Sequence, residues 1–129
     1  MILIDSDLAR VKAVCNMVLT SNSKIRHVGY YDSFGKVLCD SARDASVSLE
    51  GEGIEEMHIL NGTAASTLAL WKRSVFLLGH MDALVMITEK VVDLIVPRKD
   101  DSYYLVVFDA GTSVTIVGEA RLKIFELER

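Results

Sequence analysis

Residues 82–109, DALVMITEKVVDLIVPRKDDSYYLVVFD, contain three apolar, β-branched runs that are separated only by short polar breaks. The runs are residues 83–88, 91–96 and 103–108. They are rich in Val, Ile, Leu and Tyr, which suit a pleated surface buried on one or both sides. The breaks are Glu89 with Lys90, and residues 97–102, which begin with a proline that has no N–H for a ladder. The stretch therefore predicts three antiparallel strands, which the rest of the chain must cover or extend.

The composition is that of a globular domain with an apolar excess. Of the 129 residues, 50% are hydrophobic and 25% are charged, so residues 1–129 are expected to form a single domain. The mean hydropathy of +0.30 is high for a domain of this size, which has much surface to hydrate. We therefore expect a monomer to leave an apolar patch exposed, and such patches usually mark surfaces that bind a partner.

Charge and hydropathy argue against two classes of protein. The net charge of −4 offers no basic surface for nucleic acid. No apolar run reaches the roughly 18 to 20 residues that span a bilayer, and no signal peptide opens the chain. The nearest run, residues 75–87, is interrupted by Gly79, His80 and Asp82. We expect a cytoplasmic protein without a membrane span.

One helix is predicted at each end of the chain. The first covers residues 6–19, with Asp5 or Ser6 as its N-cap. The last begins at Thr112 or Ser113 and runs to about residue 127. Apolar residues recur every three or four positions and define the inner stripe of each helix. The stripes are Leu8, Val11, Cys15 and Val18 in the first helix, and Val117, Ala120, Ile124 and Leu127 in the last.

A hairpin is predicted after the first helix. Its strands are residues 25–31 and 36–40, and residues 32–35 form a turn that Asp can open and Gly can close with a positive φ. In the second strand Val37 and Cys39 alternate with more polar neighbours, which predicts one drier and one wetter face. Residues 41–53 are small and polar and predict a long loop.

A long helix is predicted over residues 54–78, with Gly79 as its stop. Its stripe is Met57, Leu60, Ala64, Leu68, Trp71, Val75 and Leu78. A straight helix of this length measures about 37 Å, more than a compact domain of this size covers comfortably. Either the helix bends near Gly62 or one end reaches a second subunit. The slim residues 62–66 suit either a close approach of another backbone or packing on the chain's own sheet.

The order of elements is α-β-β-α-β-β-β-α, which predicts an α+β domain with a single five-stranded antiparallel sheet and helices on its faces. This order resembles the roadblock family of dynein-light-chain-like domains, and more loosely the longin and profilin folds. The matching stretches are IRHVGYYDSFGKVLCDS, STLALWKRSVFLLG, ITEKVVDLIVP and SYYLVVFDAGT. The hairpin, the "EK" break and the strand ending in Pro also resemble an uncharacterised archaeal branch of such domains.

The resemblance implies a strand order of 2-1-5-4-3 and a homodimer formed by the third strands and the long helices. Residues 83–88 would then be the edge strand. The interface residues would be Leu68, Trp71, Lys72, Val75, Val85 and Ile87. A large aromatic beside two cations, as in Trp71-Lys72-Arg73, can anchor an interface. Core packing of Trp71 is the alternative.

Residues that usually carry chemistry are scattered along the chain. His27, His58 and His80 have no spacing that would place two of them and a cysteine around one metal. Cys15 and Cys39 fall in apolar patterns, which predicts two reduced, buried thiols and argues against a Cys–His nucleophile. Cross-strand or interface packing is predicted for Tyr30, Tyr31, Tyr103 and Tyr104. We expect no catalytic residue, no metal and no cofactor.

The sequence thus favours a non-enzymatic homodimer that offers a sheet-and-helix surface to a protein partner. A small GTPase or a complex scaffold is the kind of partner that the resemblance suggests. The alternative is a profilin-like domain that senses a small molecule in a pocket between the sheet and residues 41–53. An enzyme would need convergent titratable groups, which the sequence does not display.

Overall fold

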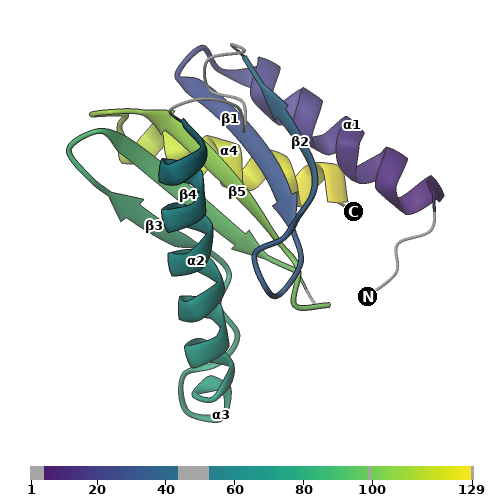
Figure 1. Ribbon diagram of the computed structural model, residues 1–129, viewed down its shortest axis with the longest axis vertical. Helices are drawn as coiled ribbons and strands as arrows, with labels where there is room; N and C mark the ends of the chain where they lie inside the picture. The colour runs from purple at the N-terminus through teal and green to yellow at the C-terminus, as the bar shows by residue number, and fades with distance from the viewer. Residues whose placement is uncertain (1–4, 44–52, 99, 129) are drawn as a thin grey trace.

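A computed structural model describes residues 5–43, 53–98 and 100–128 (Figure 1). The elements are α1 (Asp5–Ser21), β1 (Ile25–Tyr31), β2 (Val37–Ala42), α2 (Gly53–Lys72), α3 (Val75–Leu78), β3 (Leu84–Ile87), β4 (Val91–Pro97), β5 (Tyr103–Asp109) and α4 (Val114–Glu128). The strands form one antiparallel sheet in the order β2-β1-β5-β4-β3. Helices α1 and α4 lie on one face and α2 lies on the other. The predicted α+β class and strand order are confirmed, and β3 is an edge strand.

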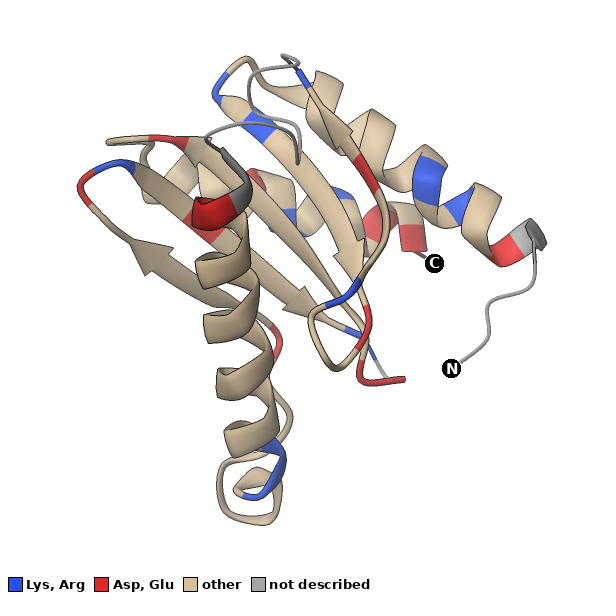
Figure 2. Ribbon diagram, viewed as in Figure 1, with Lys and Arg blue, Asp and Glu red and all other residues tan. Residues whose placement is uncertain are grey.

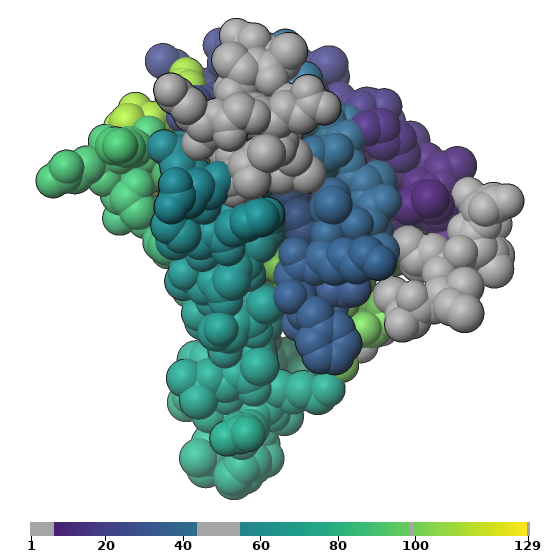
Figure 3. All heavy atoms as spheres, viewed as in Figure 1, coloured from purple at the N-terminus to yellow at the C-terminus, as the bar shows by residue number. Residues whose placement is uncertain are grey.

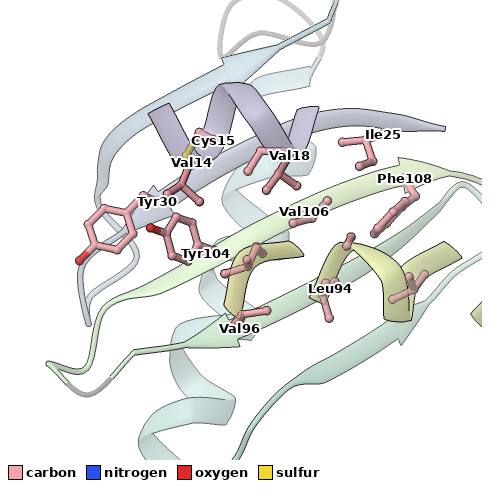
Figure 4. Packing of buried hydrophobic residues seen from close by; sticks show 14 of the residues in the cluster. Val14, Cys15, Val18, Ile25, Tyr30, Leu94, Val96, Tyr104, Val106 and Phe108 are labelled. Atoms are coloured by element: carbon pink, nitrogen blue, oxygen red, sulfur yellow. The ribbon is translucent and has the colours of Figure 1, made fainter. Parts of the chain in front are cut away.

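The face under α1 and α4 carries the larger core (Figure 4). Side chains alternate along each strand, so every second residue of β1, β4 and β5 meets the helices. These include Val28, Tyr30, Leu94, Val96, Tyr104, Val106 and Phe108. Six residues of the predicted stripes of the terminal helices are buried, Val11, Cys15, Val18, Val117, Ala120 and Ile124, whereas Leu8 and Leu127 are only partly buried.

The opposite face is covered by α2 over only part of its area. Met57 and Ala64 of α2 are buried against Tyr31, Ile95 and Leu105 of the sheet. Beyond this contact the C-terminal half of α2 continues past the sheet, and α3 forms the tip of the projection (Figures 1 and 3). No side chain of α3 is buried. The length predicted for this helical segment therefore leaves it partly without support from its own domain.

The long helix is not continuous, and the prediction of one helix over residues 54–78 is wrong at its end. The N–H groups of Arg73 and Ser74 bond the carbonyls three residues earlier, at 3.2 and 2.8 Å, and α3 begins afresh at residue 75. Such tightening is common at helix ends. Of the two alternatives for the length of this helix, a bend near Gly62 is not seen, because α2 is continuous through this residue and runs straight (Figure 1). Gly79, with φ of 83°, does end the helical segment.

The β1–β2 hairpin contains a bulge that the sequence pattern did not reveal. Tyr30 is opposite Cys39 and Tyr31 is opposite Val37, so Leu38 is an extra residue. Val37 therefore packs with the α2-side cluster and Cys39 with the α1-side cluster, although strict alternation had predicted one shared face. Cys39 is also only partly buried, which corrects the prediction of two buried thiols.

The predicted turn and caps are seen where the structure describes them. Asp32 Oδ1 accepts the N–H groups of Phe34 and Lys36 at 2.9 and 3.0 Å, and Gly35 has φ of 83°. Ser113 Oγ accepts an N–H of the first turn of α4 at 3.3 Å. The side chains of the predicted N-cap residues of α1, and residues 44–52 of the predicted long loop, lie outside the described residues.

Within the described ranges, no helix combines the length and the hydropathy that a membrane span requires.

Candidate functional site

The exposed large apolar side chains concentrate on α2, α3 and β3, which together we call the α2–α3–β3 surface. Seven lie there, Ile59 and Leu70 on α2, Phe76, Leu77 and Leu78 on α3, and Val85 and Ile87 on β3, whereas Met17, Phe34, Val114 and Leu122 are exposed elsewhere. Phe76 is 81% exposed, and leaving so large an apolar side chain in water forgoes the free energy of its burial. Seven large apolar residues gathered on three neighbouring elements mark a candidate binding surface.

The edge strand β3 contributes to this surface on one face of the sheet. Leu84 and Met86 point toward the α2-side cluster, whereas Val85 and Ile87 are exposed on the opposite face. β3 pairs only with β4 in the described part of the chain, so its outer row of backbone N–H and C=O groups is available. A second strand can therefore add to the sheet here.

The predicted interface residues divide into two groups. Lys72, Val85 and Ile87 are exposed, and Lys72 Nζ lies 2.7 Å from Asp101 Oδ2. The other three, Leu68, Trp71 and Val75, are half-buried.

Trp71 holds the tip of the projection together. Its Nε1 donates to the carbonyl of Gly79 at 3.1 Å, across the α2–α3 turn, and its side chain belongs to neither core cluster. Sequence reasoning missed the exposed apolar residues of α3 because it placed Leu78 in the inner stripe, whereas Leu78 is 65% exposed. The available signal was the run of three large apolar residues at 76–78, which one helix cannot turn toward a single core.

The charges of α2 are confined to its two ends (Figure 2). Glu55 and Glu56 lie in the first turn, where a negative charge favours the helix dipole. Lys72 ends the helix and Arg73 follows it. The helix between them carries no Asp, Glu, Lys or Arg. The body of α2 therefore lacks acidic and basic residues, while its first turn is acidic and its end is basic.

The α2-side face of the sheet also holds buried polar groups without partners. Asp93 is fully buried on β4, and neither of its carboxylate oxygens has a hydrogen-bond partner in the described part of the chain. Its cross-strand neighbours are Met86 and Val107. Burial raises the pKa of Asp93 to about 7. Tyr31 Oη and His27 Nδ1 are likewise buried without a partner among the described residues.

His27 makes one strong contact on this face. Its Nε2 lies 3.0 Å from Asp40 Oδ2, and the hydrogen bond from His27 lowers the pKa of Asp40. Cys39 packs on the other face, so His27 and Cys39 do not form a nucleophilic pair. His58 and His80 are exposed. Within residues 5–43, 53–98 and 100–128, no three His, Cys, Asp or Glu side chains come together as metal ligands.

The four tyrosines form two cross-strand pairs, as predicted. Tyr30 and Tyr104 have ring centroids 5.1 Å apart on the α1 side, and Tyr31 and Tyr103 have centroids 5.5 Å apart on the α2 side. All four rings are buried, so they are packing groups within this domain.

No protein-family model matches the sequence, and no curated protein matches it. Solved structures do share its fold. A structure of MglB with tetrameric arrangement has a TM-score of 0.72 at 18% identity, over 98% of this chain and 91% of that one. The gliding protein MglB from Thermus thermophilus gives 0.69 at 15% identity, over 98% and 94%. A Roadblock/LC7 domain from Streptomyces avermitilis gives 0.65 at 7% identity, over 91% and 93%. The chain therefore has a roadblock-like fold.

Proposed function

We propose that this roadblock-like domain is a non-enzymatic interaction module that forms a homodimer and offers a sheet-and-helix surface to a protein partner. The observation that carries the proposal is the α2–α3–β3 surface, which is apolar on both sides of an open sheet edge. The tetrameric arrangement named for one MglB structure supports assembly through this fold.

A twofold axis beside β3 accounts for the features of this surface. Antiparallel pairing of two β3 strands joins the sheets and brings Val85 and Ile87 of the two copies together on one face. On the other face the two α2 helices lie side by side and run in opposite directions. The apolar residues of both faces are then buried in one interface.

The charges at the ends of α2 favour this antiparallel arrangement. It brings Glu55 and Glu56 of one copy toward Lys72 and Arg73 of the other. A parallel arrangement would set like charges against each other at both ends. Such patterns fix register and partner choice more than they add affinity.

The first experiment measures the oligomeric state by analytical ultracentrifugation at micromolar concentration. We expect a dimer for the wild type, and a monomer with an unchanged far-UV spectrum for Ile87→Lys, because the lysine places a charge within the apolar face of the joined edge. Leu122→Lys on α4 is the matched control, since Leu122 and Ile87 are similarly exposed, at 61% and 67%. A monomeric wild type, or equal dissociation by both variants, would contradict the proposal.

A charge exchange tests the orientation of the helices. Reversing Glu55 and Glu56 to Lys is expected to weaken the dimer, and reversing Lys72 and Arg73 to Glu in the same chain is expected to restore it. Each reversal alone sets like charges together, whereas the combination rebuilds the pairs. A combined variant that is no tighter than either single reversal would exclude the antiparallel arrangement.

The partner is proposed to be a protein, either a small GTPase or the scaffold of a complex. Binding to a purified GTPase that depends on its bound nucleotide would identify the first class. Nucleotide-independent binding to a multi-protein complex would identify the second.

A second candidate function, small-molecule sensing, is favoured by the unpartnered polar atoms of Asp93, Tyr31 and His27 on the α2-side face of the described chain. A ligand that satisfied them would carry hydrogen-bond donors for the carboxyl group. Native mass spectrometry of the freshly isolated protein tests this function. A bound small molecule that is lost in Asp93→Asn would support it, and an unliganded mass would oppose it.

A further inference from the structure

Helix α1 and strand β2 are held side by side around the two cysteines. Lys12 lies one turn before Cys15 on α1, and its Nζ donates to the carbonyl of Asp40 and to Ser41 Oγ, the latter at 3.1 Å. Asp40 and Ser41 directly follow Cys39 on β2. These contacts place the Cys15 turn of the helix against the Cys39 position of the strand.

A second hydrogen bond joins α1 to β2 beside the two cysteines. Asn16, the residue after Cys15, accepts a hydrogen bond from Ser41 Oγ through its Oδ1. The bulge at Leu38 points Cys39 toward α1, where it packs against the cluster that contains Cys15. Each thiol is the largest influence on the acidity of the other, as expected for two neighbouring sulfur atoms.

The two thiols differ in exposure and acidity. Cys15 is 0% exposed, whereas Cys39 is partly exposed. The neighbouring Cys15 thiol lowers the pKa of Cys39, and the charge of Lys12 acts in the same direction, whereas burial and the charge of Asp40 act against them. The neighbouring Cys39 thiol, together with burial, raises the pKa of Cys15. A partly exposed, more acidic thiol beside a buried second thiol is the arrangement of redox-sensing cysteines.

We propose that Cys39 and Cys15 form a peroxide-responsive dithiol, in which Cys39 is the attacking thiolate and Cys15 is the resolving thiol. The Cys39 thiolate attacks one oxygen of a hydroperoxide, the O–O bond breaks, and the departing oxygen takes a proton and leaves as water or an alcohol. Cys39 becomes a sulfenic acid. The Cys15 sulfur then attacks the Cys39 sulfur, its proton joins the departing hydroxide as water, and a disulfide links α1 to β2. Both sulfurs are oxidised by one electron each and the peroxide is reduced by two.

The proposal is independent of dimerisation. The pair lies on β2, at one edge of the sheet, whereas the proposed dimer uses β3 at the other edge. Oxidation is therefore expected to leave the oligomeric state unchanged.

The decisive experiment uses the full chain with hydrogen peroxide as the oxidant. Reduced protein is treated with a slight excess of peroxide, blocked with an alkylating reagent and digested with trypsin without reduction. We expect a disulfide between the peptides covering residues 13–24 and 37–43, which reverts on addition of dithiothreitol. Sulfinic or sulfonic acid at Cys39 without the linked peptides would overturn the proposal.

Serine variants assign the two roles. In Cys15→Ser the sulfenic acid at Cys39 persists and is trapped by dimedone, because no resolving thiol is present. In Cys39→Ser the buried Cys15 reacts with peroxide at least about tenfold more slowly than Cys39 does in the other variant. Equal rates would overturn the assignment. Far-UV spectra establish that both variants are folded, and the wild-type peptide map decides the proposal if either is not.

Lys12 variants test the source of the reactivity. Lys12→Met is expected to slow the reaction of Cys39 several-fold near pH 7 and to raise the pH at which the rate reaches half of its maximum. Lys12→Arg is expected to keep both near wild-type values, since the positive charge remains. A methionine variant with an unchanged pH–rate profile would show that Lys12 does not position or stabilise the thiolate.

Discussion

The two faces of the sheet differ in how far their buried polar groups are hydrogen-bonded. On the α1/α4 face the buried polar groups are paired: Arg98 Nη1 donates to Tyr30 Oη at 2.7 Å, and Arg98 Nη2 lies 3.1 Å from Glu128 Oε2. Tyr30 Oη also donates to Ser102, and Tyr104 Oη donates to Glu128. This network ties the end of α4 to the β4–β5 turn, so the larger core is closed by satisfied polar contacts.

On the α2 face, buried polar atoms remain without partners, and the covering helix extends past the sheet. Asp93, Tyr31 and His27 each carry at least one such atom in the described part of the chain. Leaving these groups unpaired costs free energy, so this face stabilises the monomer less than its buried area suggests. We infer from this difference that the α1/α4 face supplies stability, while the α2 face is available for assembly or binding.

The largest expected effect comes from truncating one leucine on each face. Leu94→Ala, in the larger core, should lower the free energy of unfolding by about 2–5 kcal/mol. Leu68→Ala, on the half-buried side of α2, should lower it by only about 1 kcal/mol, because that side chain already meets water. Urea unfolding of the monomeric Ile87→Lys background measures both. Equal losses would show that the two faces contribute alike.

Asp93 gives the α2 face a pH dependence. In the unfolded chain the carboxyl ionises near its ordinary pKa of 3.8, whereas the folded chain keeps the proton up to about pH 7. Between these values the folded state binds more protons, so the free energy of unfolding should fall as the pH rises, by up to about 4 kcal/mol. The stabilising contribution of the bound proton is complete below about pH 4 and lost above about pH 7.

Asp93→Asn should remove this slope and make the protein more stable at pH 8, with little gain at pH 4. Chemical denaturation at a series of pH values measures it. Asp109→Asn, at the half-exposed end of β5, is the control and should leave the slope in place. A slope that persists in Asp93→Asn would assign it to another group.

The paired tyrosines compare the same chemical change on the two faces. Tyr30→Phe should cost about 1–3 kcal/mol, since its hydroxyl accepts from Arg98 and donates to Ser102. Tyr31→Phe should be neutral or stabilising by up to about 1 kcal/mol, because its buried hydroxyl has no partner in the described part of the chain. Thermal unfolding of both variants checks the sign. A destabilised Tyr31→Phe would indicate that its hydroxyl is in fact hydrogen-bonded.

The smallest effects are expected when the glycine inside α2 or the glycine inside α4 is replaced by alanine. Apart from its chain neighbours and its own helix backbone, neither Gly62 on α2 nor Gly118 on α4 has an atom of the described chain within 4 Å of the position that a Cβ would occupy. Ala at either site should therefore stabilise the monomer by about 0.5–1 kcal/mol through helix propensity. Only Gly62→Ala should alter the dimer, if a second helix approaches there; sedimentation of both variants decides this.

The sequence predicted the sheet well, because local signals agreed with one another. The β-branched runs placed β3, β4 and β5 to within two residues at each end, and the Asp32–Gly35 turn fixed the hairpin. The strand order came from the resemblance alone, since no local pattern specifies which strands are neighbours.

What could not be predicted depends on contacts between distant segments. Asp93 lies within an apolar run and gave no sign of being an unpaired buried acid. The helix breaks at residues 73–74, where no sheet of the described chain lies beneath it (Figure 1). The spacing of apolar residues along the sequence does not show where the sheet ends. Residues 44–52 lie outside the described part of the chain, so the predicted pocket against that loop stays a prediction.

The extra residue at Leu38 has a consequence for how this hairpin can evolve. Because strand side chains alternate strictly, Cys39 stays opposite Tyr30, on the side of Cys15, only while Leu38 is left out of the ladder. If Leu38 were paired with Tyr30 instead, Cys39 would move opposite Gly29 and turn away from Cys15, although both cysteines would remain in the gene. Relatives of this protein are therefore better compared by the pairing register of the hairpin than by whether the cysteines are present.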